Sequence, residues 1–447
     1  MDSPLSYLDL HPFVRATVID KILGLVIGSA IGDAVGLYTE FLPASKSRQL
    51  YSANPISLIP PATPFHSDSH RDKFTPGSWT DDTDHALLLL LSYLHHGRLD
   101  PRDFAARLKT WCDGQGLRVL NRPPLGLGRT VKTVVDHPLF TDTSEEAAKD
   151  RWEKTGRNNA ANGSLMRIHP IGVIAIGMGS MEEAWEHAMA NGMVTHWDPR
   201  CVVCCCIQVG LLRAILRGDI TDESDVNRIL EGAFTWVSSR GEINPELWKS
   251  PDGEQIPLDY SEFRKYMYAE GYHTLQLDDS RTMGYVYKCL GSALLLLRTV
   301  IRDKPFTGVY SDLNGFYKHI ESLFQEGGDA DTNCCVAGAL LGAWYGYGAL
   351  PSQWRDGLVH KEWLMEKTTN LMITMGVMDG LYDGKHDEDT AMDGGRGWLS
   401  KEEMDKVERD LVKMLLGKVR DRDQEAKAKE RERRRGGSTV WGRVLGL

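Results

Sequence analysis

Two stretches rich in small residues decide the fold of this chain. Residues 22–36 read ILGLVIGSAIGDAVG, with a glycine at every fourth position from Gly24 to Gly36. The same interval recurs much later in the chain, at Gly338, Gly342 and Gly346. On an α-helix this spacing places the glycines along one face, so two such faces can cross with their backbones close together. The pattern predicts two tightly packed helices whose flanking residues are brought near each other.

Clusters of oxygen-bearing side chains stand directly before two predicted helices. Residues 80–84 read Thr-Asp-Asp-Thr-Asp ahead of a leucine-rich segment at 86–95, and residues 327–332 read Gly-Gly-Asp-Ala-Asp-Thr ahead of the second glycine-rich helix. Helix capping explains one or two acids at such a position, but it explains a cluster poorly. Carboxylate and hydroxyl oxygens are the ligands that Mg²⁺ prefers. The two clusters therefore predict a site for one or two divalent cations, which would orient a substrate and activate a water.

The remainder of the sequence predicts an all-α protein. Runs of helical length and period are frequent, whereas alternating runs of Val, Ile and Thr with hairpin turns are absent. We expect ten or more helices in one compact bundle that forms a single domain, residues 1–418. The charged segment 419–447 is expected to be a solvated helix or disordered. Three stretches read as long irregular loops: 43–78, 236–279 and 379–397.

Composition narrows the functional class. With 52 Lys and Arg against 62 Asp and Glu, the net charge is −10, which disfavours nucleic acid as a general partner. Residues 1–17 lack the apolar core of a secretory signal, and residues 22–36 are too short to span a membrane. The eight cysteines are poorly spaced for a disulfide framework. We therefore expect an intracellular protein with reduced thiols, in the cytoplasm or alternatively the nucleus, and no membrane partner. Its oligomeric state is left open.

Two further motifs lie between the acidic clusters. Residues 162–167 read Asn-Gly-Ser-Leu-Met-Arg, where small residues at a helix start leave amides free for a phosphate and Arg167 stands near enough to assist. Residues 195–199 read Thr-His-Trp-Asp-Pro, and His196 can donate to a phosphate, act as an acid or base, or cap a helix. Each motif taken alone is more often structural.

These four motifs and an opening motif before them resemble, in their order along the chain, the five motifs of the ADP-ribosylglycohydrolases. This family includes the dinitrogenase-reductase-activating glycohydrolases. The opening motif is residues 28–36 followed by Glu40 and Phe41, and the resemblance extends to about Trp354. The resemblance implies an all-α fold, a compact single-domain orthogonal helix bundle with a binuclear Mg²⁺ centre in a cleft, Mn²⁺ being the alternative metal. It also implies hydrolysis of the glycosidic bond at the anomeric carbon of an ADP-ribosyl group. An ADP-ribosylated protein or another ADP-ribose conjugate would be the substrate.

The resemblance also implies roles for individual residues. Metal would be held from two sides by the oxygen-bearing residues of the acidic clusters, namely Thr80, Asp81, Asp82, Asp329, Asp331 and Thr332. Glu40 matches a glutamate over the metal and the reacting sugar, and either Asp82 or Glu40 would take the proton of the attacking water. Three residues match positions that line the ADP-ribose diphosphate: Gly163, Ser164 and His196. Asp33 is expected to support the metal ligands from behind.

The sequence leaves two other functions open. A descendant of the family that binds ADP-ribose or serves a structural role without catalysis would be expected to lose metal acids, yet all six stand here. A metal-dependent phosphohydrolase would cleave the diphosphate instead. Asp84 and His85 replace a neutral polar residue and a methionine found in many members, which is expected to add negative charge near the site. Phe140 is a guess for the aromatic residue that stacks on adenine.

Overall fold

The chain is described by a computed structural model that covers residues 3–53, 55–243, 258–303 and 314–444. Across these ranges it contains eighteen α-helices, several short 3-10 turns and no β-strand, so the all-α prediction is confirmed. The chain divides into two compact units, one of residues 1–64 and 76–397 and one of residues 65–75 and 398–447.

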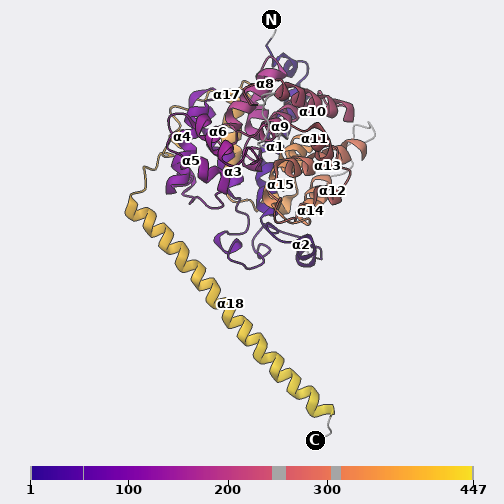
Figure 1. The fold of residues 1–447 in the computed structure, drawn as a ribbon, viewed down its shortest axis with the longest axis vertical. Helices are drawn as coiled ribbons and strands as arrows, with labels where there is room; N and C mark the ends of the chain where they lie inside the picture. Colours follow the sequence, from indigo (N-terminus) through magenta and orange to yellow (C-terminus); the bar gives the residue numbers. More distant parts are fainter. Residues whose placement is uncertain (1–2, 54, 244–257, 304–313, 445–447) are drawn as a thin grey trace. The chain divides into compact units, whose positions relative to one another are not determined.

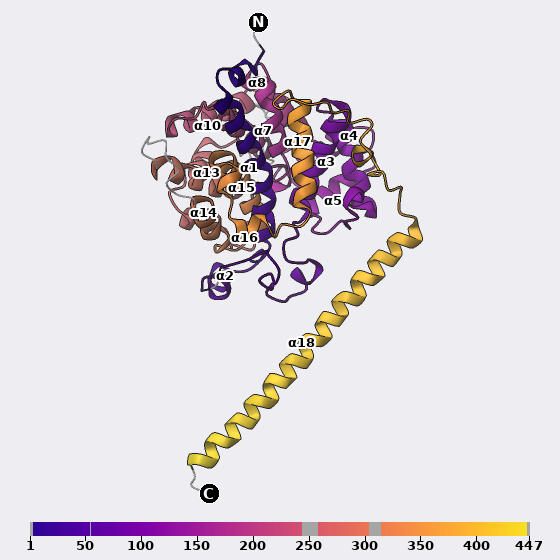
Figure 2. The same cartoon turned by 180° about the vertical axis from the view of Figure 1, so that it is seen from behind.

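Helix α1 (Pro12–Gly36) and helix α15 (Ala330–Tyr345) lie against each other in the first unit (Figures 1 and 2). A side chain added to any glycine of the α1 face would collide with the backbone of α15. The contacts run antiparallel along the two helices: Gly24 with Gly342, Gly28 with Gly338, Gly32 with Cys334, and Gly36 with Ala330. The predicted close crossing is therefore present, and it places the end of α1 at the start of α15.

Helix α3 (Asp81–His96) follows the first acidic cluster and is buried on nearly all sides. It begins where the Thr80 hydroxyl accepts a hydrogen bond from the Asp82 amide, and it ends before Gly97, whose φ of 66° is left-handed. The leucine run at 87–91 is buried all round, as its composition predicts.

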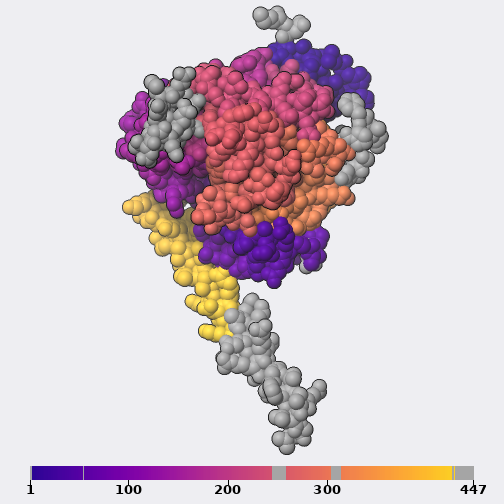
Figure 3. Space-filling view, turned by 45° about the vertical axis from the view of Figure 1, so that its right-hand side comes forward, coloured from indigo at the N-terminus to yellow at the C-terminus, as the bar shows by residue number. Residues whose placement is uncertain are grey.

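The remaining helices surround these three elements. The helices that precede α15 are α2 (Ala44–Tyr51), α4 (Pro101–Thr110), α5 (Arg129–Val135), α6 (Ser144–Lys154), α7 (His169–Ile174), α8 (Met181–Gly192), α9 (Pro199–Arg217), α10 (Glu223–Ser238), α11 (Tyr260–Met267), α12 (Tyr272–Leu275), α13 (Val286–Asp303) and α14 (Gly315–Phe324). Those that follow it are α16 (Ser352–Arg355), α17 (Lys361–Thr374) and α18 (Lys401–Val444). Helix α13 packs against α11, α14 and α15, and α14 packs against α15. Figure 3 shows the salmon and orange surfaces of this part of the chain side by side.

Helix α9 is a core helix that contains four of the eight cysteines. By length and composition alone it is apolar enough to cross a membrane, but 94% of that window is buried inside the fold. All eight cysteines are free and seven of them are buried. The prediction of reduced thiols is consistent with this arrangement.

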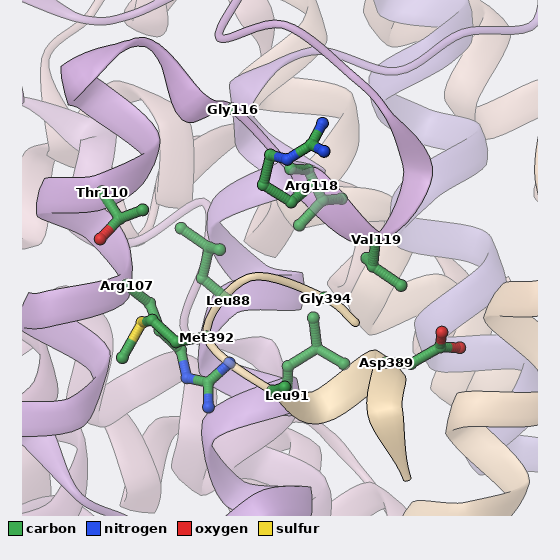
Figure 4. Close-up of a pocket in the computed structure, with 12 residues that line it drawn as sticks. Leu88, Leu91, Arg107, Thr110, Gly116, Arg118, Val119, Asp389, Met392 and Gly394 are labelled. Atoms are coloured by element: carbon green, nitrogen blue, oxygen red, sulfur yellow. The ribbon is translucent and has the colours of Figure 1, made fainter. Parts of the chain in front are cut away.

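The predicted loops are more ordered than the sequence suggests. Segment 43–78 contains α2, and the described part of 236–279 contains α11 and α12, while residues 244–257 lie outside the described residues. The acidic segment 379–397 packs on α3 and α4: Gly384 lies against the Leu94 carbonyl, and Arg107 donates to the Thr390 carbonyl at 2.8 Å. Figure 4 shows the cavity enclosed there, whose volume of about 20 Å³ is enough for one water and far too small for a nucleotide.

The second unit is built from helix α18 and the loop 65–75. Lys418 donates to the Asp72 carbonyl at 2.7 Å, and Arg422 forms an ion pair with the Asp72 carboxylate at 2.6 Å. The domain boundary proposed at residue 418 falls inside this helix. The backbone of the charged tail continues as helix to Val444.

The α1–α15 crossing predicts the effect of a single methyl group. A Cβ at Gly32 would overlap the Cys334 carbonyl, which belongs to a helix backbone and cannot move aside cheaply. We expect Gly32→Ala to lower the free energy of unfolding by about 2 kcal/mol or more, measured by urea denaturation. Gly177→Ala is the control, because nothing lies within 4 Å of a Cβ there. Equal stability of the two variants would contradict the proposed packing constraint.

Candidate metal centre

The segment that leaves α1 lies beside the loop that enters α15. The amide of Phe41 donates to the Gly328 carbonyl, and the amide of Gly328 donates back to the Leu42 carbonyl at 3.0 Å. Gly327 and Gly328 have φ values of 66° and 69°, and a Cβ at either would run into a carbonyl oxygen. The paired glycines are therefore needed for this close approach of two backbones.

This pairing brings three carboxylates together. Oxygen atoms of Glu40, Asp329 and Asp331 all lie within 4.8 Å of one another, a grouping that can hold a metal ion. Glu40 was expected over the metal rather than among its ligands, and the structure places its carboxylate in the same group as the two aspartates. Residues that are nearly 300 positions apart in sequence thus form one site because α1 and α15 cross.

Asp33 fixes the first acidic cluster from the opposite side. One carboxylate oxygen accepts from the Thr80 amide at 2.8 Å, and the other accepts from the Thr83 amide at 3.1 Å and the Thr83 hydroxyl at 2.6 Å. Both carboxylate oxygens of Asp33 therefore accept hydrogen bonds from the start of α3 and hold it against α1. Its position supports the neighbouring acids from behind, where the sequence placed it.

The two acidic clusters meet at Asp82. The Thr80 hydroxyl donates to the Asp82 carboxylate at 3.0 Å. Burial and the charge of Asp329 raise the pKa of the same carboxylate, and Thr332 lowers it. The second oxygen of Asp82, Oδ1, is buried and has no hydrogen-bond partner among the described residues. A buried carboxylate oxygen without a partner is costly and indicates a ligand that supplies positive charge.

Burial and mutual repulsion dominate the electrostatics of the centre. Burial raises the pKa of Asp33 to about 6, and burial together with the charge of Glu40 raises the pKa of Asp329 to about 6. Burial raises the pKa of Asp81 well above its ordinary value, and the charges of Asp82 and Glu40 raise it further. The pKa values of Asp82 and Asp331 are raised in the same way. No Lys or Arg among the described residues forms an ion pair with any of these five aspartates.

The donor set fits a hard divalent cation. Every candidate ligand offers an oxygen atom. Several carboxylates are buried close together, and their mutual repulsion is relieved by a cation. Asp82 Oδ1 also has no hydrogen-bond partner among the described residues. The structure groups two of the expected ligands, Asp329 and Asp331, with Glu40. A metal-binding role for Thr80, Asp81, Asp82 and Thr332 stays a prediction. An oxygen-only set of this kind suits Mg²⁺ or Mn²⁺.

The residues expected to line the diphosphate lie around a short turn at Asn162–Ser164. Gly163 lies directly against the His196 ring, so any side chain there would press on the imidazole. His196 Nδ1 bonds to the Thr195 hydroxyl at 2.7 Å, while Nε2 is buried without a partner. The Ser164 side chain is buried, and its hydroxyl accepts a hydrogen bond from the Cys205 thiol at 3.5 Å.

Arg167 positions this turn rather than facing outward. Its guanidinium is fully buried and donates to the Gly163 carbonyl at 3.2 Å and to the Thr195 hydroxyl at 2.8 Å. Burial lowers the pKa of Arg167 to about 10, and burial followed by the charge of Arg167 lowers that of His196 well below its usual value. His196 is therefore neutral at physiological pH.

Two expectations from the sequence need correction. Asp84 does not add uncompensated charge, because its carboxylate pairs with Arg122 at 3.1 Å and accepts from the indoles of Trp79 and Trp111. Phe140 is 1% exposed and packed in the core, so it is not available to stack on adenine.

Sequence reasoning missed two residues of the site. Gly126, with a φ of 94°, packs against the Asp81 carboxylate, and the pair of glycines at 126 and 128 was the available signal. Asn162 donates from Nδ2 to Asp329 Oδ2 at 2.7 Å, a contact between distant segments that no local pattern announces.

Comparison with known proteins identifies relatives of this chain. A family model described as ADP-ribosylglycohydrolase matches residues 14–427. The ADP-ribosylarginine hydrolase Tri1 of Serratia proteamaculans is 26% identical over 346 residues, which are 77% of this chain and 76% of that protein. The ADP-ribosyl-[dinitrogen reductase] glycohydrolase of Rhodospirillum rubrum is 23% identical over 352 residues, 76% of this chain and 91% of that protein.

A solved structure shows the same fold. It is an ADP-ribosylglycohydrolase-related protein complex with a TM-score of 0.51 and 23% sequence identity. The match covers 80% of this chain and 99% of the other. At this identity the likeness concerns the fold alone.

The raised carboxylate pKa values predict how metal and pH act on stability. A carboxyl group with a raised folded pKa stabilises the native state below its unfolded pKa near 4, and this contribution is lost as the pH rises through about 6. Mg²⁺ binds the ionised form, so it should raise the melting temperature more at about pH 7.5 than at about pH 5. Thermal unfolding with and without Mg²⁺ at both pH values measures this. Asp329→Asn is the control that should lose the metal-dependent gain, and an equal gain at both pH values in the unaltered protein would contradict the prediction.

Proposed function

The chain belongs to the ADP-ribosylglycohydrolase family, and we propose that it is a Mg²⁺-dependent hydrolase that releases ADP-ribose from an ADP-ribosylated protein or small molecule. The bond cleaved is the glycosidic bond at the anomeric carbon of the ribose. The single observation that carries the proposal is the convergence of Glu40, Asp329 and Asp331 within 4.8 Å, beside the Asp82 cluster.

The bond at an anomeric carbon breaks through a state with oxocarbenium character, which is electron-poor at carbon. Bound Mg²⁺ would supply the positive charge that orients ribose hydroxyls and makes a water more acidic. Glu40 and Asp82 are the candidates to take the proton of the attacking water, which is supported by the grouping of Glu40 with the two aspartates and by the unpartnered Oδ1 of Asp82. The carboxylates that surround the centre also stabilise positive charge developing on the sugar.

The nucleotide part of the substrate belongs on the His196 side of the site. Neutral His196 offers an unpartnered ring nitrogen, and Gly163 leaves the turn free of a side chain that would block the approach. Arg167 donates hydrogen bonds to the Gly163 carbonyl and to the Thr195 hydroxyl, and so holds the turn and the residue next to His196 in place. A diphosphate bound there would be fixed relative to the carboxylates, which favours reaction by orientation.

ADP-ribosylarginine is the first acceptor linkage to test. Two relatives, from Serratia proteamaculans and Pseudomonas putida, are named ADP-ribosylarginine hydrolases, at 26% and 24% identity. The relative from cattle named ADP-ribosylhydrolase ARH3 is 22% identical, and its name specifies no acceptor residue. Substrates with other acceptor linkages, serine included, therefore belong in the same assay.

The proposed function predicts which acids are required. We expect Asp82→Ala and Asp329→Ala each to lower the rate of ADP-ribose release at least about a hundredfold, because each removes a carboxylate from the reacting centre. Removal of Mg²⁺ by a chelator should have a similar effect that added Mg²⁺ reverses. Chromatography of the products from defined ADP-ribosylated substrates measures the rates.

Asp219→Ala is the matched control, since Asp219 is exposed and, among the described residues, forms an ion pair with Arg217 alone, at the end of α9. Full activity in either centre variant would reject the site. Tight ADP-ribose binding without turnover would instead support a non-catalytic descendant. AMP and ribose phosphate as products would support a phosphohydrolase.

A further inference from the structure

The side chain of Asn162 connects two parts of the candidate site. Its Nδ2 donates to Asp329 Oδ2 at 2.7 Å, so it touches the carboxylate group directly. Its main chain begins the turn Asn162–Ser164, whose Gly163 lies against His196. Asn162 is 7% exposed, so water competes little for this hydrogen bond.

We propose that Asn162 is a positioning residue that couples binding of the divalent cation to binding of the ADP-ribose diphosphate. This inference rests on the proposed function and extends it. Occupation of either half of the site would hold Asn162 in place and so prepare the other half.

The hydrogen bond restricts Asp329 in a defined way. Only the amide nitrogen of Asn162 can face the carboxylate, because the amide oxygen would repel it. The bond therefore restricts the rotation of a carboxylate that belongs to the group formed with Glu40 and Asp331. Gly284 lies beside the pair, and a Cβ there would be 3.4 Å from Asp329 Oδ2 and 3.9 Å from Asn162 Oδ1, which is ordinary contact distance. Hydrogen bonds of this kind orient metal ligands and raise metal affinity.

The backbone of Asn162 is held as firmly as its side chain. Its amide donates to the Gly284 carbonyl at 3.1 Å, and the preceding residue, Ala161, forms an antiparallel bridge with Tyr285. Its carbonyl accepts from the amides of Leu165 and Met166 at 2.8 and 3.1 Å. A shift of the turn consequently shifts the side chain on Asp329.

Each half of the site has an unsatisfied buried atom that a ligand would engage. On the nucleotide side this is His196 Nε2, and on the metal side it is Asp82 Oδ1. Asn162 contacts an element of both halves, through Gly163 and through Asp329. Because coupling between two binding sites is reciprocal, the cation should tighten ADP-ribose binding by the same factor by which ADP-ribose tightens cation binding.

The test measures this coupling factor by calorimetry. The affinity for ADP-ribose is determined with and without Mg²⁺ in the full-length chain, and the affinity for Mg²⁺ with and without ADP-ribose. We expect Mg²⁺ to tighten ADP-ribose binding in the unaltered protein, and we expect Asn162→Ala to reduce that factor at least about fivefold. Asn162→Ser is the second variant. Its side chain is too short to reach Asp329 but keeps a small polar residue at the turn, so the coupling factor should fall as in Asn162→Ala.

Asn191→Ala is the matched control, because Asn191 is also a buried carboxamide, and it donates to the His187 carbonyl rather than to an acid of the centre. If Asn162 has a merely structural role, Asn162→Ala will be less stable but will have the same coupling factor as Asn191→Ala. That result would overturn this inference and leave the proposed function standing. An unaltered protein that binds ADP-ribose with no dependence on Mg²⁺ would also overturn it. Failure to bind ADP-ribose at all, even with Mg²⁺, would instead overturn the proposed function and the inference with it.

Discussion

The close contact between the backbones of α1 and α15 is the constraint on which the rest of the structure depends. Glycines on one helix face the backbone of the other along the whole crossing. The contact requires that side chains be absent, and it fixes the register as well as the distance of the two helices. Because Gly36 meets Ala330 at one end of the crossing, the segment after α1 and the loop before α15 have no freedom to separate. The candidate metal centre is built on those two segments.

The same arrangement concentrates negative charge where water is scarce. Asp33, Asp81, Asp82, Asp329 and Asp331 are all held with raised pKa values in one region. Such a cluster destabilises the metal-free fold, and the extensive apolar packing around α3, α9 and α15 offsets that cost. A site that is unfavourable when empty is a strong binder of the cation that relieves it. The same aspartates therefore lower the stability of the metal-free fold and provide the site proposed to bind the cation.

Much of the candidate site could be anticipated from local sequence. The acids of residues 80–84 and 327–332 were recognised because oxygen donors at two helix starts exceed what capping needs. Asp33 was expected to support the acidic cluster from behind, and its carboxylate accepts hydrogen bonds from the Thr80 amide and the Thr83 hydroxyl. Expectations were wrong where partners come from elsewhere in the fold. Asp84 is neutralised by Arg122, and Phe140 is buried, and neither fact is visible in the neighbouring sequence.

The sequence by itself determined the all-α class, the close helix crossing and the identity of the acidic residues, because glycine spacing and helix-start chemistry are local properties. The tertiary structure decided how those residues act together. It placed Glu40 in the same group as Asp329 and Asp331, turned the Ser164 hydroxyl into the core, and joined Asn162 to Asp329. The physical reason is that these relations are contacts between segments far apart in the chain. Such contacts depend on the direction in which each side chain leaves a packed backbone, and residue order alone does not specify that direction.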